Sequence, residues 1–205
     1  MTTTTPDTGS HPLYQQALST FRGLLDEARA SVDPEPNAMT LSTLRDARLS
    51  ARVVLLKGLD ARGFRFYTNY ESAKAGQIAS HPQVALCFHW KMIRDGVQVR
   101  VEGSIEKLPA VESDAYFATR PRGSRIGAWA SPQSQPLANR EEFEARIAVM
   151  EERFAGVDVP RPAHWGGYLV VPDCIEIWYG AQFRLHERHV YTREGDGWSE
   201  RMLYP

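Results

Sequence analysis

The sequence predicts a mainly β protein with helices, either an antiparallel barrel or an α+β domain. Short apolar segments of strand-like composition are separated by turn residues, which is typical of antiparallel sheets. Helical segments are inserted between these strands without a regular strand–helix alternation, which argues against a parallel sheet. The chain of 205 residues is long enough for one well-buried domain, which we expect to span residues 12–205.

The composition argues against several classes of protein. Hydrophobic residues make up 42% of the chain and charged residues 24%, as in ordinary soluble proteins. The net charge is −1 and no long run carries one sign, so binding to nucleic acid or to a membrane surface is not expected. No apolar stretch approaches the roughly 20 residues of a membrane helix, and the threonine-rich start does not match a signal peptide. We therefore expect a cytoplasmic protein.

The first half of the chain is predicted to contain one helix followed by a series of strands. Residues 1–11 lack apolar content, and we expect them to form a disordered tail. Apolar residues then recur with the helical period over 13–30, and a segment with two prolines (33–36) ends this helix. A short helix fits 72–80, with Ser72 as its N-cap. Strands are expected over 38–43, 50–57, 63–68, 84–90 and 97–108.

The second half turns helical before it returns to strands. A helix over 109–119 begins with proline and carries Glu112 in its first turns. Asn139 and Glu142 have the spacing of a capping box, so a further helix is expected to begin there. A proline-rich linker follows at 159–162. The last strands are expected over 167–171, 174–179 and 184–191, with 198–203 as a possible fourth.

The segment Arg184-Leu185-His186-Glu187-Arg188 is the most informative part of the chain. In a strand, Arg184, His186 and Arg188 would point to the same face and form a row of positive groups. Like charges in a row repel one another unless an anion or a carboxylate lies opposite them. The row therefore indicates an anion site, and the alternative interpretation is a solvated strand face.

Further cations bracket the strands of the first half. Arg52 and Lys57 stand at the two ends of an apolar strand and have opposite parity, so a regular strand would direct them to different faces. The alternative is that both side chains simply reach solvent. The segment 67–69 closes the next strand and leads into Ser72 and Lys74 at a helix start, which is typical of a phosphate site. An ordinary serine cap would explain the same residues.

A third group lies in the middle of the chain. Tyr116, Arg120 and Ser124 are spaced by four residues around Pro121, and the first two would share a helix face. An arginine with two hydroxyl groups suits a phosphate dianion. The adjacent pair at 133–134 lies in a proline-flanked loop and offers neutral hydrogen bonds. Taken together, these groups predict two separate sets of anion-binding residues with aromatic residues between them.

Several common sites are absent from the sequence. The chain has no GxGxxG, no phosphate-binding Gly-x-x-x-x-Gly-Lys loop, no CxxC or HExxH spacing and no Gly-x-Ser-x-Gly elbow. The six histidines show no ligand spacing, so no metal site is expected. Cys87 and Cys174 each lie in an apolar run, and we expect buried free thiols rather than a disulfide.

From about Ala38 to Pro205 the chain resembles the FMN-dependent pyridoxine/pyridoxamine 5′-phosphate oxidases. The matching segments are RVVLLK (52–57), FYTN (66–69), QVRVEG (98–103), YF and RPR (116–122), IGAW (126–129), QS (133–134), WGGY (165–168), WYG (178–180) and RLHER (184–188). The resemblance implies a split β-barrel that forms a homodimer, with FMN bound in clefts between the two subunits.

The resemblance also implies roles for individual residues. The implied FMN-binding residues are Arg52, Val53, Lys57, Tyr67, Thr68, Lys74, Gln98, Gln133, Ser134, Trp178 and Arg188. The implied substrate-phosphate ligands are Lys57, Tyr116, Arg120 and Ser124, with Arg184 and His186 beside the pyridine ring as catalytic residues. Ala73 stands where many members carry arginine, and a missing phosphate contact of this kind costs about 1–3 kcal/mol of FMN binding unless another group replaces it.

The reaction implied by the resemblance is the oxidation of pyridoxine 5′-phosphate or pyridoxamine 5′-phosphate to pyridoxal 5′-phosphate, the last step of vitamin B6 cofactor synthesis and salvage. FMN would accept a hydride from the C4′ carbon, and O2 would then reoxidise the flavin and release H2O2. One alternative is a related split-barrel flavin oxidase that acts on another aromatic metabolite, such as a phenazine precursor. The other is a non-catalytic carrier of flavin or pyridoxal phosphate. The set Tyr116, Arg120 and Ser124 favours a phosphorylated substrate over an unphosphorylated one.

Overall fold

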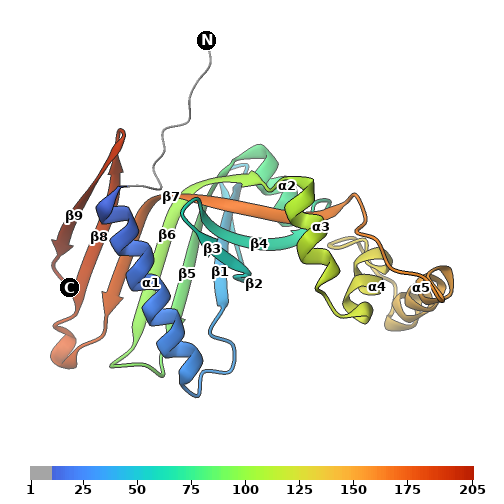
Figure 1. Cartoon of the computed structure of the whole chain (residues 1–205), viewed down its shortest axis with the longest axis horizontal. Coiled ribbons are helices and arrows are strands. Elements are labelled where there is room, and N and C mark those ends of the chain that lie inside the picture. The colour runs from blue at the N-terminus through green and yellow to red at the C-terminus, as the bar shows by residue number, and fades with distance from the viewer. Residues whose placement is uncertain (1–10) are drawn as a thin grey trace, which may run out of the picture.

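An antiparallel sheet of nine strands forms the centre of the molecule (Figure 1). The computed structural model describes residues 11–205, so the predicted tail lies outside the described residues except for His11. One long helix, α1, lies across the sheet, and the helices α3, α4 and α5 gather at one end of it (Figure 1). The mainly β, antiparallel architecture predicted from the sequence is confirmed.

The order of the strands in the sheet differs from their order in the sequence. Their bounds are β1 (Ala38–Arg45), β2 (Arg48–Leu55), β3 (Gly58–Asp60), β4 (Gly63–Asn69), β5 (Gln83–Trp90), β6 (Val97–Lys107), β7 (Trp165–Tyr179), β8 (Glu187–Glu194) and β9 (Gly197–Leu203). The hydrogen-bonded order is β2-β1-β5-β6-β7-β4-β3, and β8 and β9 extend the sheet from the second half of β7. Within the described residues no ladder joins β2 to β3, so the barrel is not closed.

Helix α1 (Pro12–Ala30) supplies much of the core, as its apolar period predicts. Proline stands in its first turn, where its missing N–H costs no helical hydrogen bond. The apolar face, which includes Tyr14, Leu18 and Phe21, is buried against the sheet. The ring of Phe21 lies about 5 Å from the rings of Phe64 and Phe88 in edge contacts. One face of the sheet is thereby covered by this helix.

Strand β7 replaces the two strands predicted over 167–171 and 174–179. Its ladder with β6 shifts register between Glu102 and Gly103, where Gly103 pairs with Pro172 and Glu102 pairs with Cys174. Asp173 is therefore an extra residue, a β-bulge that lets the strand continue past a proline. A Cβ atom on Gly103 would lie 2.1 Å from the Val171 carbonyl oxygen, so this close approach requires glycine.

The bulge also exchanges the two faces of β7. After it, Ile175 and Ile177 point into the core and are almost fully buried. Before it, the core residues are Tyr168 and Val170, whose parity is the opposite. Without the extra residue, one half of the strand would turn its apolar side chains away from the core.

The predicted row of Arg184, His186 and Arg188 on one strand is wrong. Strand β8 begins only at Glu187, and Arg184 closes the short 3₁₀ helix η2 (Gln182–Arg184). Phe183 and Arg184 have φ angles of 56° and 62°, which a strand cannot contain. The chain therefore turns sharply at Arg184, and only Arg188 belongs to the ladder.

Four shorter helices complete the chain: α2 (Ala73–Ser80), α3 (Ala110–Ala118), α4 (Arg122–Ala130) and α5 (Arg140–Arg153). Helix α5 begins as predicted, with the Asn139 side chain accepting a hydrogen bond of 2.8 Å from the backbone N–H of Glu142. Ser72 precedes α2, but its hydroxyl donates to the Asn69 carbonyl instead of capping the helix. Helix α4 was not expected from the sequence. Its Ile126 packs with Phe154, which follows α5, and Ile147 and Met150 of α5 pack against the same cluster.

The structure bears on two further expectations, the lack of a membrane helix and the state of the two cysteines. Over residues 11–205 no helix is both long enough and apolar enough to cross a membrane. Cys87 and Cys174 are free, as predicted, but both are half-buried rather than buried. Burial raises the pKa of both thiols.

Candidate functional site

A cavity of about 550 Å³ lies between β2, β4, the junction of α3 with α4, and the loop after α4. We call it the basic pocket. Its polar lining residues are Lys57, Tyr67, Thr68, Lys74, Tyr116, Thr119, Arg120, Ser124 and Gln133. Its apolar lining residues are Val53, Val54, Leu55, Pro121 and Trp165. Nine of the residues predicted from the sequence thus border one cavity, although they come from separate parts of the chain.

Lys74, in the first turn of α2, lies at one end of the basic pocket. Its ammonium group donates to the Gln133 side-chain oxygen at 2.7 Å and to the Thr68 hydroxyl at 3.1 Å. Burial, followed by the charge of Arg52, lowers the pKa of Lys74. A cation in this position is stabilised when an anion binds beside it. Ala73 begins the same helix and is exposed.

Arg52 lies behind Lys74 and does not line the basic pocket. Its guanidinium donates to the hydroxyls of Thr43 and Ser50, both at 2.6 Å, and to the Gln77 side-chain oxygen at 2.8 Å. All of these acceptors are neutral, and burial lowers the pKa of Arg52. No pattern in the sequence points to Thr43 and Gln77, because they meet Arg52 only through the pairing of β1 with β2 and the packing of α2 on β1.

Lys57 reaches the basic pocket because β2 ends before it. The strand stops at Leu55, and the backbone N–H of Lys57 then donates to the Arg65 carbonyl oxygen at 2.8 Å. The turn into β3, and not the parity of a regular strand, therefore determines where this side chain lies. Arg52 and Lys57 do face different surroundings, but the end of β2 before Lys57, and not strand parity, separates them.

Tyr116, Arg120 and Ser124 come from two helices that meet at the basic pocket. Tyr116 lies in the last turn of α3, Arg120 in the link, and Ser124 in the first turn of α4. The Nη1 atom of Arg120 is buried and has no hydrogen-bond partner within the described part of the chain. Burial also lowers the pKa of this guanidinium. A buried donor without an acceptor fits an anionic ligand oxygen.

Aromatic rings form one wall of the basic pocket. The ring centroids of Tyr67 and Tyr116 are 3.9 Å apart and their planes differ by 15°. The ring of Trp165 is nearly parallel to that of Tyr67, at 5.5 Å. Gly167 leaves room for this arrangement, because a Cβ atom there would lie 2.7 Å from the Tyr67 ring. The WGGY motif around Trp165 was visible in the sequence, but no pattern assigned it a role.

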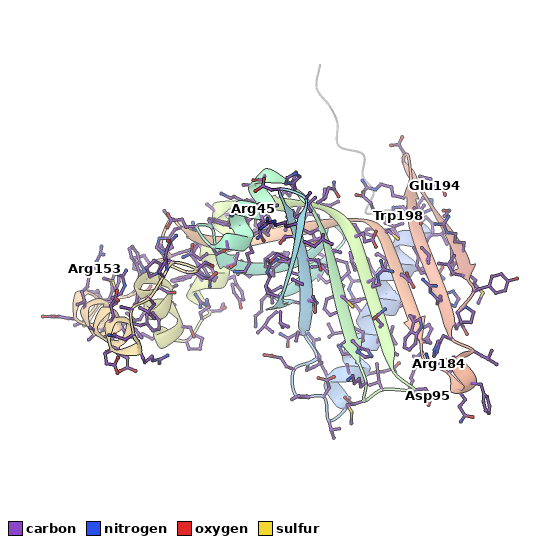
Figure 2. The ribbon with its side chains drawn as sticks, turned by 180° about the vertical axis from the view of Figure 1, so that it is seen from behind. Arg45, Asp95, Arg153, Arg184, Glu194 and Trp198 are labelled. Atoms are coloured by element: carbon purple, nitrogen blue, oxygen red, sulfur yellow. The ribbon has the colours of Figure 1, made fainter. Side chains whose placement is uncertain are left out.

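A second group of predicted residues lies at the other end of the sheet, and we call it the strand-end cluster. Gln98, Trp178 and Arg188 pair directly across β6, β7 and β8, so their side chains share one face. This face is the one that α1 leaves uncovered (Figure 2). The ring of His186 packs 4.6 Å from that of Trp178. Arg184 is exposed beside them, at the edge of the molecule (Figure 2).

Two hydrogen-bond arrangements order the strand-end cluster. The His186 Nδ1 atom accepts from the backbone N–H of Ala181 at 3.1 Å, so in the neutral ring Nε2 carries the proton. Arg188 donates through Nε and Nη2 to one carboxylate oxygen of Glu176, at 2.8 and 2.7 Å. The other oxygen of Glu176 accepts from Arg100 at 3.0 Å. Glu176 raises the pKa of Arg188 and fixes its orientation.

Within one chain the two groups do not meet. Trp165 and Trp178 stand near opposite ends of β7, a strand of 15 residues. At about 3.3 Å per residue such a strand is roughly 50 Å long. Arg184 and His186 border the strand-end cluster and not the basic pocket, so a single chain does not place them beside Lys57. Ser134, next to Gln133, is exposed and lies outside the pocket lining, with a φ of 73°.

Comparisons with known proteins give the same division of the chain. The family model described as pyridoxamine 5′-phosphate oxidase matches residues 24–154. The model described as the pyridoxine 5′-phosphate oxidase C-terminal dimerisation region matches residues 165–205. The first match contains most of the basic pocket. The second begins with β7 and contains Trp178, Arg184, His186 and Arg188 of the strand-end cluster.

Similar curated proteins carry the name pyridoxine/pyridoxamine 5′-phosphate oxidase. The protein of Xanthomonas euvesicatoria pv. vesicatoria (strain 85-10) is 57% identical over 196 residues, which is 94% of this chain and 98% of the relative. The protein of Myxococcus xanthus (strain DK1622) is 54% identical over 189 residues, covering 92% of this chain and 91% of the relative.

Solved structures share the fold. PhzG from Burkholderia lata 383, in complex with tetrahydrophenazine-1-carboxylic acid, superposes with a TM-score of 0.84 at 29% identity and covers 98% of both chains. A pyridoxamine 5′-phosphate oxidase-related, FMN binding protein from Nostoc punctiforme PCC 73102 superposes with a TM-score of 0.72 at 19% identity, covering 91% of this chain and 96% of that one. At that identity the second likeness concerns the fold alone.

Proposed function

Because the chain belongs to the pyridoxamine 5′-phosphate oxidase family, we propose that it oxidises pyridoxine 5′-phosphate or pyridoxamine 5′-phosphate to pyridoxal 5′-phosphate, with FMN as its cofactor. One observation carries the proposal. Lys57, Lys74 and Arg120 line one cavity, Arg52 lies directly behind it, and none of the four forms an ion pair within the described residues. Cofactor and substrate are both phosphate monoesters, so such a site suits the pair.

The four cations divide into two places for phosphate. Lys74, Thr68 and Gln133 form a hydrogen-bonded group with Arg52 behind it, and we assign the FMN phosphate to this end. Lys57, Tyr116, Arg120 and Ser124 would hold the substrate phosphate, with the unpartnered Nη1 of Arg120 as one donor. When bound, FMN supplies the redox chemistry by accepting a hydride from the C4′ carbon. Fixing the phosphate orients the substrate and lowers the entropic part of the barrier.

We further propose that a second copy of the chain completes each site. The region that contains most of the strand-end cluster matches a dimerisation region of the family, which supports a homodimer. The cluster lies on a sheet face that α1 does not cover, and it is separated from the basic pocket of its own chain by the length of β7. In a twofold dimer the strand-end cluster of one copy can face the basic pocket of the other. Gln98, Trp178 and Arg188 would then contact the flavin from the partner.

Arg184 and His186 would act on the pyridine ring. Arg184 is always charged and is exposed at the rim of the cluster, where it can polarise the ring oxygen or the C4′ substituent. His186 is held against Trp178, and in its neutral form it presents Nε2–H to a ligand, because Nδ1 already accepts from Ala181. In this proposal O2 would be the final acceptor of the two electrons and, with two protons, would leave as H2O2.

A second candidate follows from the likeness to PhzG, a phenazine-related protein by its bound molecule. An unphosphorylated aromatic substrate would use the aromatic wall and not the second group of phosphate ligands. The presence of Tyr116, Arg120 and Ser124 in one cavity supports the phosphorylated substrate. The cytoplasmic location and the single domain over 12–205 stay predictions.

The test is the absorbance spectrum of the FMN-loaded protein during anaerobic addition of substrate. With pyridoxamine 5′-phosphate we expect the flavin band to bleach and, after oxygen is admitted, H2O2 to appear in proportion to the aldehyde. A parallel titration uses tetrahydrophenazine-1-carboxylic acid. Bleaching by the phenazine compound alone would favour the second candidate, and a yellow protein that neither ligand bleaches would be a carrier.

A further inference from the structure

Trp165 lies where the phosphate-binding arginine and the tyrosine pair of the basic pocket meet. We propose that Trp165 is a positioning residue for phosphate recognition, whose indole ring holds the Arg120 guanidinium in the orientation that meets the ligand. This inference rests on the proposed function, because it takes the phosphate of the substrate as the ligand of Arg120. It also gives a role to the WGGY motif, of which the proposed reaction makes no use.

The contact between the two side chains is close, and no carboxylate among the described residues pairs with Arg120. The guanidinium carbon of Arg120 lies 4.5 Å from the Trp165 ring centroid and 5.3 Å from that of Phe117. Cation–π contacts of this kind stabilise a guanidinium most strongly when it is desolvated. The Arg120 side chain forms no ion pair, and its buried Nη1 forms no hydrogen bond, within residues 11–205. Stacking on the two rings is therefore the main contact that holds it.

Trp165 is itself held firmly, so it can orient a neighbour. Its side chain is only 7% exposed, and its ring meets that of Phe117 edge-on at 5.0 Å. Its backbone N–H donates to the Pro162 carbonyl, and its own carbonyl accepts from Arg161 at 2.6 Å. It also pairs with Asn69 in the ladder between β7 and β4. The indole is thus fixed from both its backbone and its edge.

The same ring aligns the tyrosines of the basic pocket. The planes of Tyr67 and Tyr116 lie within 9° and 6° of the Trp165 plane. Gly167, two residues later, leaves the space that Tyr67 occupies. Trp165 therefore sets the positions of Arg120 and Tyr116 together, two of the four groups assigned to the substrate phosphate.

Loss of the indole would leave Arg120 free to adopt other rotamers, and ligand binding would then have to order it. The affinity for a phosphorylated ligand should fall by about tenfold, the value that a cation–π contact of roughly 1–2 kcal/mol implies. The affinity for the same ligand without its phosphate should not change. A ring that serves only the core would lower both affinities or neither.

The experiment is an equilibrium titration of the FMN-loaded protein with pyridoxal 5′-phosphate and, separately, with pyridoxal. We expect Trp165→Leu to weaken the affinity for pyridoxal 5′-phosphate by about tenfold and to leave the affinity for pyridoxal unchanged. Trp165→Phe should weaken the affinity for pyridoxal 5′-phosphate less, because it keeps an aromatic ring. Trp198→Leu is the matched control, since Trp198 is 6% exposed, lies near Arg193 and is remote from the basic pocket. Equal losses for both ligands, or none, would overturn the inference.

A double-mutant cycle keeps the inference testable if Trp165→Leu does not fold. In an Arg120→Lys background, where the planar guanidinium is gone, Trp165→Phe should cause no further loss of pyridoxal 5′-phosphate affinity. Full additivity of the two changes would show that Trp165 does not act through Arg120. If the parent protein does not bind pyridoxal 5′-phosphate more tightly than pyridoxal, the proposed function is wrong. That result differs from the one that would contradict only the role of Trp165.

Discussion

At the scale of single residues, the basic pocket is marked by cations that have no carboxylate partner within the described residues. Most arginines of the chain that form ion pairs do so near the surface, as Arg62 does with Glu112. Arg52, Lys74 and Arg120 are half-buried and have neutral partners or none. Burial costs such groups solvation that only a bound anion can replace. Their residue types and approximate places were predictable from the sequence, but their convergence needed the fold.

Replacing Arg184 should separate cofactor binding from catalysis. In Arg184→Ala we expect FMN to remain bound, because the phosphate end of its site lies in the basic pocket, while turnover with pyridoxamine 5′-phosphate falls by at least about tenfold. Flavin content and steady-state peroxide release measure the two effects. Leu185→Ala, at an equally exposed neighbour, is the control. Unchanged turnover in Arg184→Ala would remove this residue from the mechanism.

His189 should make the stability of the fold depend on pH. Its ring lies between the carboxylates of Glu187 and Glu200, and chiefly the hydrogen bond to Glu187 raises the pKa of His189 in the folded protein. A raised folded pKa means that the stabilisation is fully present below the unfolded value of about 6.5 and is lost as pH rises through the folded pKa. The pair is partly exposed, so the loss should not exceed about 1 kcal/mol.

Urea unfolding at one protein concentration, at pH values of roughly 6 and 9, measures this loss. The parent protein should lose more free energy of unfolding than His189→Gln, which has no charge to lose. Parallel pH profiles for the two proteins would show that His189 is not the titrating group.

At the scale of elements, the sequence predicted regular segments and missed those that depend on backbone irregularity. Helix α1 was predictable because its buried residues follow a 3.6-residue period. The η2 turn was not, because Phe183 and Arg184 adopt positive φ angles that residues of these types rarely take. The continuity of β7 was missed because Pro172 suggests a strand end, whereas the bulge lets the strand pass it.

The bulge should make Gly103 sensitive to the smallest substitution. In Gly103→Ala the new Cβ would lie 2.1 Å from a backbone oxygen of β7, which cannot move without breaking the ladder. We expect a loss of about 2–3 kcal/mol in the free energy of unfolding. Gly23→Ala in α1 is the matched control, since nothing lies within 4 Å of its Cβ, and it should gain about 0.5–1 kcal/mol. Denaturant titration of both variants and of the parent protein measures these changes. Equal free energies of unfolding for the two variants would contradict the expectation.

At the scale of the whole molecule, the candidate site is spread over two ends of one sheet. The residues that the sequence indicated for phosphate binding border the basic pocket, and Gln98, Trp178 and Arg188 lie together in the strand-end cluster. The separation of these two groups within one chain could not be predicted from residue patterns, because it follows from the order and length of the strands. Residue patterns therefore indicated candidate members of the site, whereas the expectation that two subunits share it came from the family resemblance and stays a prediction.

Mixing two inactive variants tests that assembly. Arg120→Ala damages the basic pocket and Arg184→Ala the strand-end cluster, so each homodimer should lack activity at both sites. After subunit exchange, about half of the dimers are mixed and one of the two sites in each is intact, which predicts about a quarter of the parental activity. No recovery, with exchange shown by a mass or affinity label, would mean that both groups act within one chain.

The extra residue at Asp173 has a consequence for how this chain can diverge. Side chains along β7 can be exchanged, but the number of residues between Trp165 and Trp178 cannot change by one. Loss of a single codon there would turn either Tyr168 and Val170 or Ile175 and Ile177 out of the core, and would carry the tryptophan at that end to the opposite side of the sheet. A deletion would therefore damage the half of the site at that end of β7, and changes in length should be confined to the loops.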